Sequence, residues 1–204
     1  YNSNLTCVKH YRKLFENLNT QQPPSKIKKI NFPFHYVDLQ ITESCVIEGF
    51  FQSEKYFKNS RNEILNLFPK KDKINKISMH VRRGDYVTKK EYHNVLSKDY
   101  YLRCMDKFPN ERFLIFSDDL QWCQRNFSGD RFSFYQGLND LDDLTTMASC
   151  KHNIISNSSF SWWGAWINNH SNKIVLYPSR WVGPNLGHLN TTDIPCEEWT
   201  MVRC

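Results

Sequence analysis

The segment Ile74-Asn75-Lys76-Ile77-Ser78-Met79-His80-Val81-Arg82-Arg83-Gly84-Asp85 sets the fold class. Its first eight residues predict a buried strand, and a polar cluster follows where that strand ends. Helices and strands then alternate: the pattern predicts helices at 98–108, 120–126, 140–149 and 159–168, and strands at 112–116, 132–134, 153–156 and 173–177. This alternation predicts an α/β fold with helices on both faces of a parallel sheet. Ligands of such folds bind beyond the carboxyl ends of the strands.

The composition is that of a globular chain with an excess of positive charge. Hydrophobic residues make up 40% and charged residues 24% of the 204 residues, which excludes a disordered chain. No apolar run approaches the ~20 residues of a membrane-spanning helix, and no signal segment follows Tyr1, so we expect a soluble chain. The formal charge of +6 suits an anionic ligand such as a phosphate, a nucleotide or a nucleic acid. Because the basic residues are spread along the chain, a nucleic-acid binder is disfavoured.

Neither the cysteines nor the glycosylation triplets identify a compartment. The seven cysteines form no CxxC pair, so we expect mostly buried, reduced thiols: Cys7, Cys45, Cys104, Cys123, Cys150, Cys196 and Cys204. Asn-x-Ser/Thr triplets begin at Asn4, Asn126, Asn157, Asn169 and Asn190. They would accept glycans only in a secretory pathway, and most are explained by chance because Asn and Ser are common here.

Three predicted strands end in polar clusters that we expect to meet in one crevice. These clusters are 80–85, 117–119 and 156–159. The third cluster contains Asn157, Ser158 and Ser159 and stands where a helix begins. Its hydroxyls and free backbone N–H groups, at the positive end of the helix dipole, suit an anion such as phosphate. Ordinary helix N-capping is the competing interpretation.

The adjacent arginines Arg82 and Arg83 favour the phosphate interpretation. Two guanidinium groups that leave a buried strand suit a pyrophosphate, and Asp85 can hold one of them in place. A surface salt bridge is the plain alternative. Arg83-Gly84-Asp85 also spells a tripeptide that integrins recognise, but adhesion requires an exposed, mobile loop rather than a strand end.

Asp118 and Asp119 allow three interpretations: metal ligands, acceptors for the N–H groups of a guanine edge, or, for Asp119, a helix N-cap. Because the arginine pair already supplies positive charge, we expect a site without a metal. The aromatic run 160–166 has the spacing of a helix core, and stacking of Trp162 or Trp163 on a sugar or base is the alternative. The sequence assigns no partner to His93, His152, His170 or His188, which we expect to be structural or exposed.

These segments resemble the α-1,2-fucosyltransferases of glycosyltransferase family 11. The resemblance is carried by His80-Val81-Arg82-Arg83-Gly84-Asp85-Tyr86-Val87, by Phe116-Ser117-Asp118-Asp119 with Trp122-Cys123, and by the run from Cys150 to Trp166. Phe51-Gln52-Ser53-Glu54-Lys55-Tyr56-Phe57 and Pro178-Ser179-Arg180-Trp181 also resemble that family. The likeness therefore extends from about Gly49 nearly to the end of the chain.

The resemblance implies a two-lobed fold of the GT-B type whose carboxy-terminal, Rossmann-like lobe binds GDP-fucose without a metal or other cofactor. Here that lobe would be residues 73–204. By likeness, Arg82 would bind the β-phosphate, with Arg83 beside it, and Ser158 or Ser159 would bind phosphate. His80 and Asp118 or Asp119 would lie at the guanine.

The amino-terminal part departs from the family pattern. The family's Gly-Leu-Gly-Asn-Gln segment does not occur, so residues 1–72 would be a remnant of the amino-terminal, acceptor-side lobe with a helix ending near Phe68. Activity of this chain alone is therefore an open question.

The resemblance implies an inverting transfer of L-fucose from GDP-β-L-fucose to the 2-OH of a galactose-containing glycan. Asp85, Glu54 or a residue of the missing lobe would be the general base. The alternative is a GDP-sugar- or glycan-binding module without catalysis. The compartment stays open: cytoplasmic or membrane-associated in a microbe, with peripheral membrane association of the full-length protein allowed, or the Golgi lumen in a eukaryote.

Overall fold

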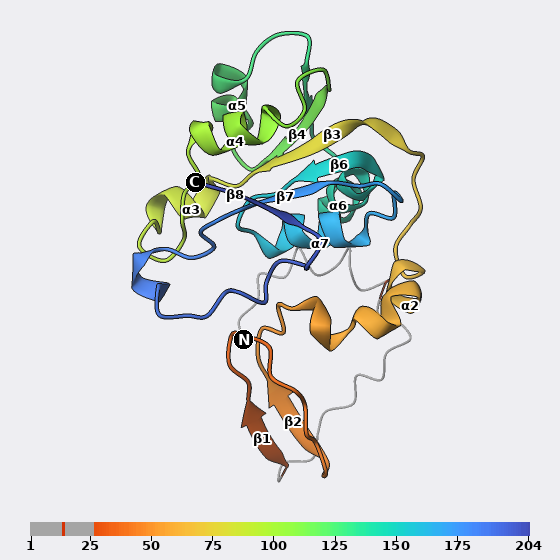
Figure 1. The fold of residues 1–204 in the computed structure, drawn as a ribbon, viewed down its shortest axis with the longest axis vertical. Coiled ribbons are helices and arrows are strands. Elements are labelled where there is room, and N and C mark those ends of the chain that lie inside the picture. The colour runs from red at the N-terminus through yellow and green to blue at the C-terminus, as the bar shows by residue number, and fades with distance from the viewer. Residues whose placement is uncertain (1–13, 15–26) are drawn as a thin grey trace. The chain divides into compact units, whose positions relative to one another are not determined.

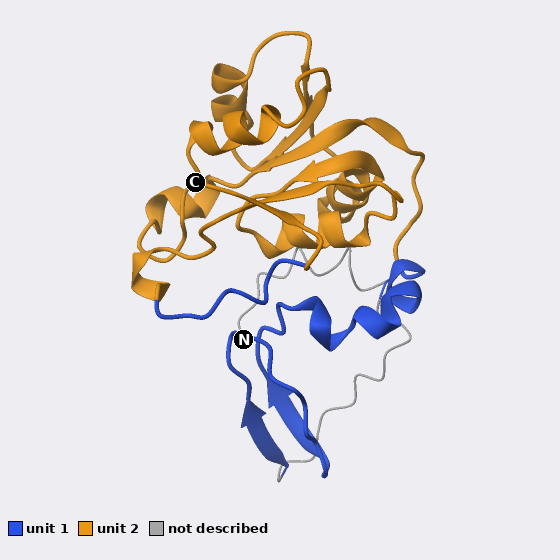
Figure 2. Ribbon diagram, viewed as in Figure 1, with its two compact units in different colours: residues 1–67, 188–196 blue, residues 68–187, 197–204 orange. Residues whose placement is uncertain are grey.

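The computed structural model describes Leu14 and residues 27–204 and divides into two compact units (Figure 2). The first unit contains residues 1–67 and 188–196, and the second contains residues 68–187 and 197–204. Asn4, Cys7 and most of the first unit's amino-terminal third lie outside the described residues. Within the described part of the chain, no helix is both long and apolar enough to cross a membrane.

The first unit is built on a small parallel sheet of two strands. Strand β1 (Lys28–Asn31) pairs with β2 (Cys45–Glu48), and two short 3-10 turns, Glu54–Tyr56 and Lys58–Ser60, lead into α2 (Arg61–Leu65). The predicted helix therefore exists, but it ends at Leu65 rather than near Phe68. Aromatic rings supply the packing: Phe51 lies 5.8 Å from Phe32 and 5.2 Å from Tyr56 between ring centroids.

A late segment of the chain completes the first unit. Asp193 accepts a hydrogen bond from the backbone N–H of Tyr36 (3.3 Å) and forms an ion pair with Lys55. The Tyr36 ring in turn lies 4.8 Å from the Tyr56 ring. These contacts explain why residues 188–196 group with the amino-terminal residues, which no local sequence pattern indicates.

The second unit is a six-stranded, wholly parallel sheet, as the alternation predicts (Figure 1). The strands are β3 (Ile74–Val81), β4 (Phe113–Ser117), β5 (Phe132–Tyr135), β6 (Cys150–Ile154), β7 (Val175–Pro178) and β8 (Thr200–Val202). Their spatial order is β5-β4-β3-β6-β7-β8. Counted along the chain from β3, this is 3-2-1-4-5-6, the order of doubly wound nucleotide-binding sheets. Strands are added to one side of β3 as far as β5 and to its other side from β6 onward, so the carboxyl ends of β3 and β6 mark the topological switch point.

Helices cover both faces of this sheet. Phe113 and Ile115 of β4 pack in one buried cluster with α4 (Lys98–Met105) and α5 (Leu120–Asn126). Leu114 and Phe116 pack in another cluster, with Met147 of α6 (Asp140–Ser149). Because side chains alternate along a strand, these two clusters lie on opposite faces. Figure 1 shows α4 and α5 on one side of the strands, and α6 and α7 (Ser159–Ile167) on the other.

The differences from the predicted elements have local causes. Strand β6 runs from Cys150 to Ile154 instead of 153–156, because residue 150 already pairs with Ile74 across an irregularity in the ladder. Two α-helices or strands of the second unit escaped prediction: β8, a strand of three residues at the sheet edge, and α3 (Gly84–Thr88), a single short helical segment. Both are too short to carry a periodic signal.

Candidate functional site

The three polar clusters come together at the carboxyl edge of β3, β4 and β6. These strands are neighbours in the sheet and parallel, so their ends share one edge. A direct link crosses the switch point, because His80 Nδ1 lies 2.8 Å from the Ser156 hydroxyl. The structure therefore brings together residues from all three clusters that the sequence singled out.

Arg82 is held by two carboxylates. Its guanidinium lies 2.6 Å from Asp85 Oδ1 and 3.1 Å from Asp118 Oδ2. The Tyr86 ring centroid lies 5.2 Å from Arg82 Cζ, within cation–π range. Asp85 thus holds this guanidinium, as the sequence predicts. The Nε atom of Arg82 is buried and has no hydrogen-bond partner among the described residues.

Arg83 points to a separate set of partners. Its Nε lies 3.2 Å from Asp119 Oδ2, and its guanidinium stacks 4.2 Å from the Trp122 ring centroid. Asp119 also caps α5, since its Oδ1 accepts from the backbone N–H of Trp122 (3.0 Å). The N-cap interpretation of Asp119 is thereby confirmed.

Asp118 joins the two arginines. Its Oδ1 accepts the backbone N–H of Arg83 (2.8 Å), while Oδ2 pairs with Arg82. This approach needs glycine at position 84: a Cβ there would lie 3.0 Å from Asp118 Cγ and closer still to Oδ2. The Arg83-Gly84-Asp85 tripeptide is thus ordered by ion pairs and opens α3, unlike the mobile loop that adhesion requires.

His80 is a buried, neutral imidazole near the carboxyl end of β3. Burial, and secondarily the nearby positive charge of Arg82, lowers the pKa of His80 to about 3. Its ring centroid lies 5.7 Å from that of Phe160, and only 5% of the residue is exposed. A neutral ring can donate one hydrogen bond and accept another without adding charge.

The loop after β6 presents the amino terminus of α7. Ser156, Asn157 and Ser158 are buried, and Ser159 is exposed. Ser158 occupies the N-cap position, yet its side chain makes no capping hydrogen bond, so ordinary N-capping does not account for its hydroxyl. The Asn157 amide donates to the carbonyls of Asn94 (2.9 Å) and Trp181 (2.8 Å). Its Oδ1 is buried without a hydrogen-bond partner in the described part of the chain.

The aromatic run on α7 belongs mainly to the core. Trp162 is 5% and Trp166 1% exposed, and their rings stack with centroids 6.2 Å apart. Trp162 also lies 5.5 Å from the Trp199 ring. The core interpretation is therefore confirmed for these two tryptophans, and stacking of Trp162 on a ligand is excluded by its burial.

The sequence missed several residues that build the site. Tyr86, His93, Asn94, Trp122 and Trp181 all contact residues of the three clusters or support such contacts. Tyr86 and Trp122 stand within the segments that carry the family resemblance, which was a usable signal. The contacts of Asn94 and Trp181 come from distant loops and had none.

Histidines outside the clusters fall into two groups. His152 accepts the backbone N–H of Ile174 (3.0 Å), and His170 Nε2 lies 3.2 Å from the Ser149 carbonyl, so both are structural as expected. His93 was expected to be structural or exposed but stacks on Tyr86 beside the site.

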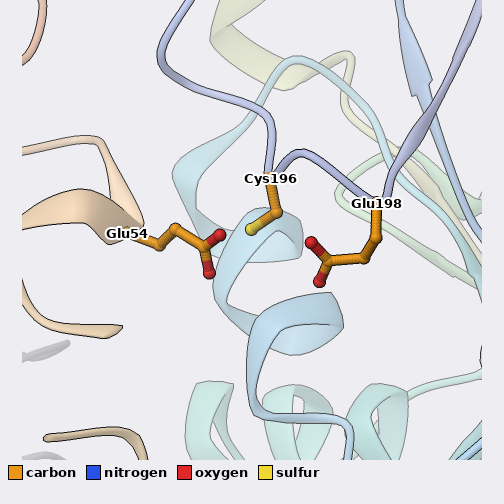
Figure 3. A group of neighbouring side chains, drawn as sticks. All are labelled: Glu54, Cys196 and Glu198. Atoms are coloured by element: carbon orange, nitrogen blue, oxygen red, sulfur yellow. The ribbon is translucent and has the colours of Figure 1, made fainter. Parts of the chain in front are cut away.

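Two side chains with metal-ligating atoms lie close together within the first unit. Ligand atoms of Glu54 and Cys196 lie within 4.8 Å of each other (Figure 3).

Comparison with known proteins places the chain in a family. The model described as glycosyl transferase family 11 matches residues 18–203. The chain belongs to glycosyltransferase family 11. Its relatives include α-1,2-fucosyltransferases at about 30% identity, as the sequence motifs indicate.

Three relatives illustrate the range of proteins to which this family 11 chain is similar. An α-1,2-colitosyltransferase of Escherichia coli is 34% identical over 180 residues, which cover 76% of this chain and 61% of the relative. The O-antigen biosynthesis glycosyltransferase WbnK of Escherichia coli is 30% identical over 190 residues, or 79% of this chain and 62% of the relative. Galactoside α-(1,2)-fucosyltransferase 1 of Saimiri sciureus is 30% identical over 107 residues, which cover 45% of this chain and 28% of the relative. No solved structure matches.

The matched region thus spans about three fifths of the length of the two bacterial relatives (61% and 62%).

Proposed function

We propose that this chain provides the donor site of a glycosyltransferase that moves L-fucose from GDP-β-L-fucose to the 2-OH of a galactose-containing glycan. The reaction inverts the anomeric carbon and needs no metal. In this proposal the protein has the GT-B architecture, with residues 73–204 as the GDP-sugar lobe and residues 1–72 as part of the acceptor-side lobe. Family membership and the parallel sheet support it.

One observation carries the proposal: a charged arginine and a helix amino terminus follow the carboxyl ends of two neighbouring parallel strands, β3 and β6. Arg82 follows β3, and Ser158 and Ser159 open α7 after β6. Guanidinium groups and helix N-termini both bind phosphate, by charge-assisted hydrogen bonds and by free backbone N–H groups. Together they suit a pyrophosphate, with Arg82 on the β-phosphate and Ser158 or Ser159 on a neighbouring oxygen.

The guanine would lie toward His80 and the aspartates. Neutral His80 can exchange hydrogen bonds with a base without repelling Arg82. Asp118 or Asp119 would accept from guanine N–H groups. Each oxygen already accepts one hydrogen bond or ion pair in the structure, but a carboxylate has about four acceptor positions, so a further contact is compatible.

The chemistry follows from where charge develops. As the fucosyl bond breaks, negative charge grows on the departing GDP, and Arg82 and the α7 terminus stabilise it. Removal of one such preorganised donor typically costs ~10²–10³ in rate. Asp85 binds Arg82 at 2.6 Å, which favours an orienting role for it over that of general base. Glu54 in the first unit remains the other candidate base on this chain.

The acceptor and the transferred sugar are proposals drawn from the relatives. The names of the relatives specify galactoside fucosyl transfer for some and colitosyl transfer for another. We propose fucose, on the strength of the fucosyltransferase motifs, and a donor comparison tests this choice.

Calorimetric titration of the 204-residue chain with GDP, GDP-fucose and UDP, with EDTA or Mg²⁺ present, tests the donor site. We expect saturable GDP and GDP-fucose binding that tolerates EDTA, no UDP binding, and loss of binding in Arg82→Ala. Arg125→Ala is the matched control, since it removes an equally charged, exposed arginine from the last turn of α5.

Absence of GDP binding by a folded sample would refute the donor assignment for this chain. Binding of GDP-fucose without transfer to a galactoside, in this chain and in one extended at its amino terminus, would instead favour a non-catalytic binding module.

A further inference from the structure

Tyr86 contacts residues that follow two neighbouring strands, Arg82 after β3 and Asn157 after β6. Its ring centroid lies 5.2 Å from Arg82 Cζ, on the loop after β3. Its hydroxyl donates to the Asn157 carbonyl at 3.1 Å, on the loop after β6. The residue next to Asn157 is Ser158, the N-cap of α7. One side chain therefore spans the switch point between the arginine and the helix terminus.

A second ring supports Tyr86. The His93 imidazole stacks on it with centroids 4.1 Å apart and planes inclined by 8°. The loop that carries His93 is itself fixed, because it forms a bridge with Val182 and the Tyr92 carbonyl accepts from Gly183 N (2.8 Å). This support limits how far the Tyr86 ring can tilt.

Asn157 connects Tyr86 back to the loop that carries His93. Asn157 accepts from the Tyr86 hydroxyl with its carbonyl and donates from its amide to Asn94, the neighbour of His93. The contacts thus run from Tyr86 to Asn157, to Asn94, to His93 and back to Tyr86. A closed set of contacts holds a side chain more firmly than a single hydrogen bond, because movement must break several contacts at once.

The Tyr86 hydroxyl acts as a hydrogen-bonding group and not as a base. Burial raises the pKa of Tyr86, with the nearby carboxylates adding to the rise, while the charge of Arg82 and a hydrogen bond with Ser158 oppose it. The hydroxyl therefore keeps its proton at neutral pH. Its contribution is geometric.

We propose that Tyr86 is a positioning residue that holds the Arg82 guanidinium at a set distance from the amino terminus of α7, so that both bind one pyrophosphate. This inference rests on the proposed function, since it requires a diphosphate in the crevice. Two anion-binding groups on separate loops act together only if their spacing is maintained, and a small misplacement sharply weakens their joint action.

The test compares GDP with GMP, which lacks the β-phosphate that Arg82 is proposed to bind. Tyr86→Phe keeps the ring but removes the hydroxyl, and we expect about fivefold weaker GDP binding with GMP binding changed by less than about twofold. Tyr86→Leu also removes the ring beneath Arg82, and we expect about 30-fold weaker GDP binding. Calorimetry measures the affinities, and thermal unfolding of each variant checks the fold.

Tyr92→Phe is the matched control, because Tyr92 lies in the same loop as His93 but is 51% exposed. It should bind both nucleotides as the wild type does. Equal losses for GDP and GMP in Tyr86→Phe, or a variant that no longer folds, would overturn the proposal, because the hydroxyl would then serve the fold. Unchanged GDP binding in Tyr86→Phe overturns it while the proposed function stands. Failure of the wild-type chain to bind GDP overturns both.

Discussion

Gly84→Ala should loosen both arginines without altering either one. A Cβ at position 84 would lie 3.0 Å from Asp118 Cγ and nearer to Oδ2, so the Asp118 carboxylate must move away. It would then lose the Arg83 backbone N–H, now 2.8 Å away, and the Arg82 guanidinium, 3.1 Å away. Each partly exposed, charge-assisted contact contributes about 1 kcal/mol to the free energy of unfolding. The better helix propensity of alanine offsets less than ~1 kcal/mol of the loss. We expect a net loss of about 1–2 kcal/mol in the free energy of unfolding.

Urea unfolding and GDP titration measure the effect, and a double-mutant cycle isolates its cause. In an Asp118→Ala background the carboxylate that the added methyl group would displace is absent, so Gly84→Ala should there be neutral or stabilising by less than ~1 kcal/mol. GDP binding should fall about tenfold in the single variant, because Arg82 loses one of its two carboxylate supports. An equal cost in both backgrounds, or no cost in the wild-type background, would refute this account of Gly84.

Two further predictions concern the stability of the sheet. Burial holds the pKa of His80 at about 3 in the folded chain, against 6.5 for the unperturbed group. Between these two values the unfolded chain binds a proton that the folded chain does not. The stability contributed by neutral His80 is therefore full above pH 6.5 and falls as the pH drops below it. Urea unfolding at pH 6.5 and pH 5 should show wild type losing about 2 kcal/mol more than His80→Gln; equal losses would contradict the burial of a neutral ring. Asn153, 1% exposed, donates to Ser78 Oγ (2.6 Å) and the Met147 carbonyl (2.9 Å) and accepts from Asn168 (2.7 Å). Asn153→Ala should therefore lower the free energy of unfolding by about 3 kcal/mol while the folded fraction binds GDP normally, and a change in GDP affinity would show that this network also shapes the site.

Much of the second unit could be predicted because its signals are local. The strand at 74–81 is observed with those bounds, and α5 and α6 begin and end where the pattern placed them. Capping residues account for this accuracy: Asp119 and Asn139 each accept a backbone N–H of the first turn. The short elements β8 and α3, and the pairing of β1 with β2, depend on neighbours that no local pattern specifies.

The candidate site could likewise be predicted only in part. Arg82, Arg83 and Asp85 were found because they directly follow a buried strand, and parallel strands end at one edge. The supports of that site were not found, since His93, Asn94 and Trp181 reach it from loops distant in the chain.

The sequence by itself determined the α/β class, the approximate places of the main strands and the polar residues beyond them, because hydrophobic periodicity and helix caps act over a few residues. Only the tertiary structure decided the strand order, which places β6 beside β3 and creates the switch point. It also decided which partner each charge takes, Asp118 for Arg82 and Asp119 for Arg83. Such pairings depend on distances between separate strand ends, and these distances exist only once the sheet has formed.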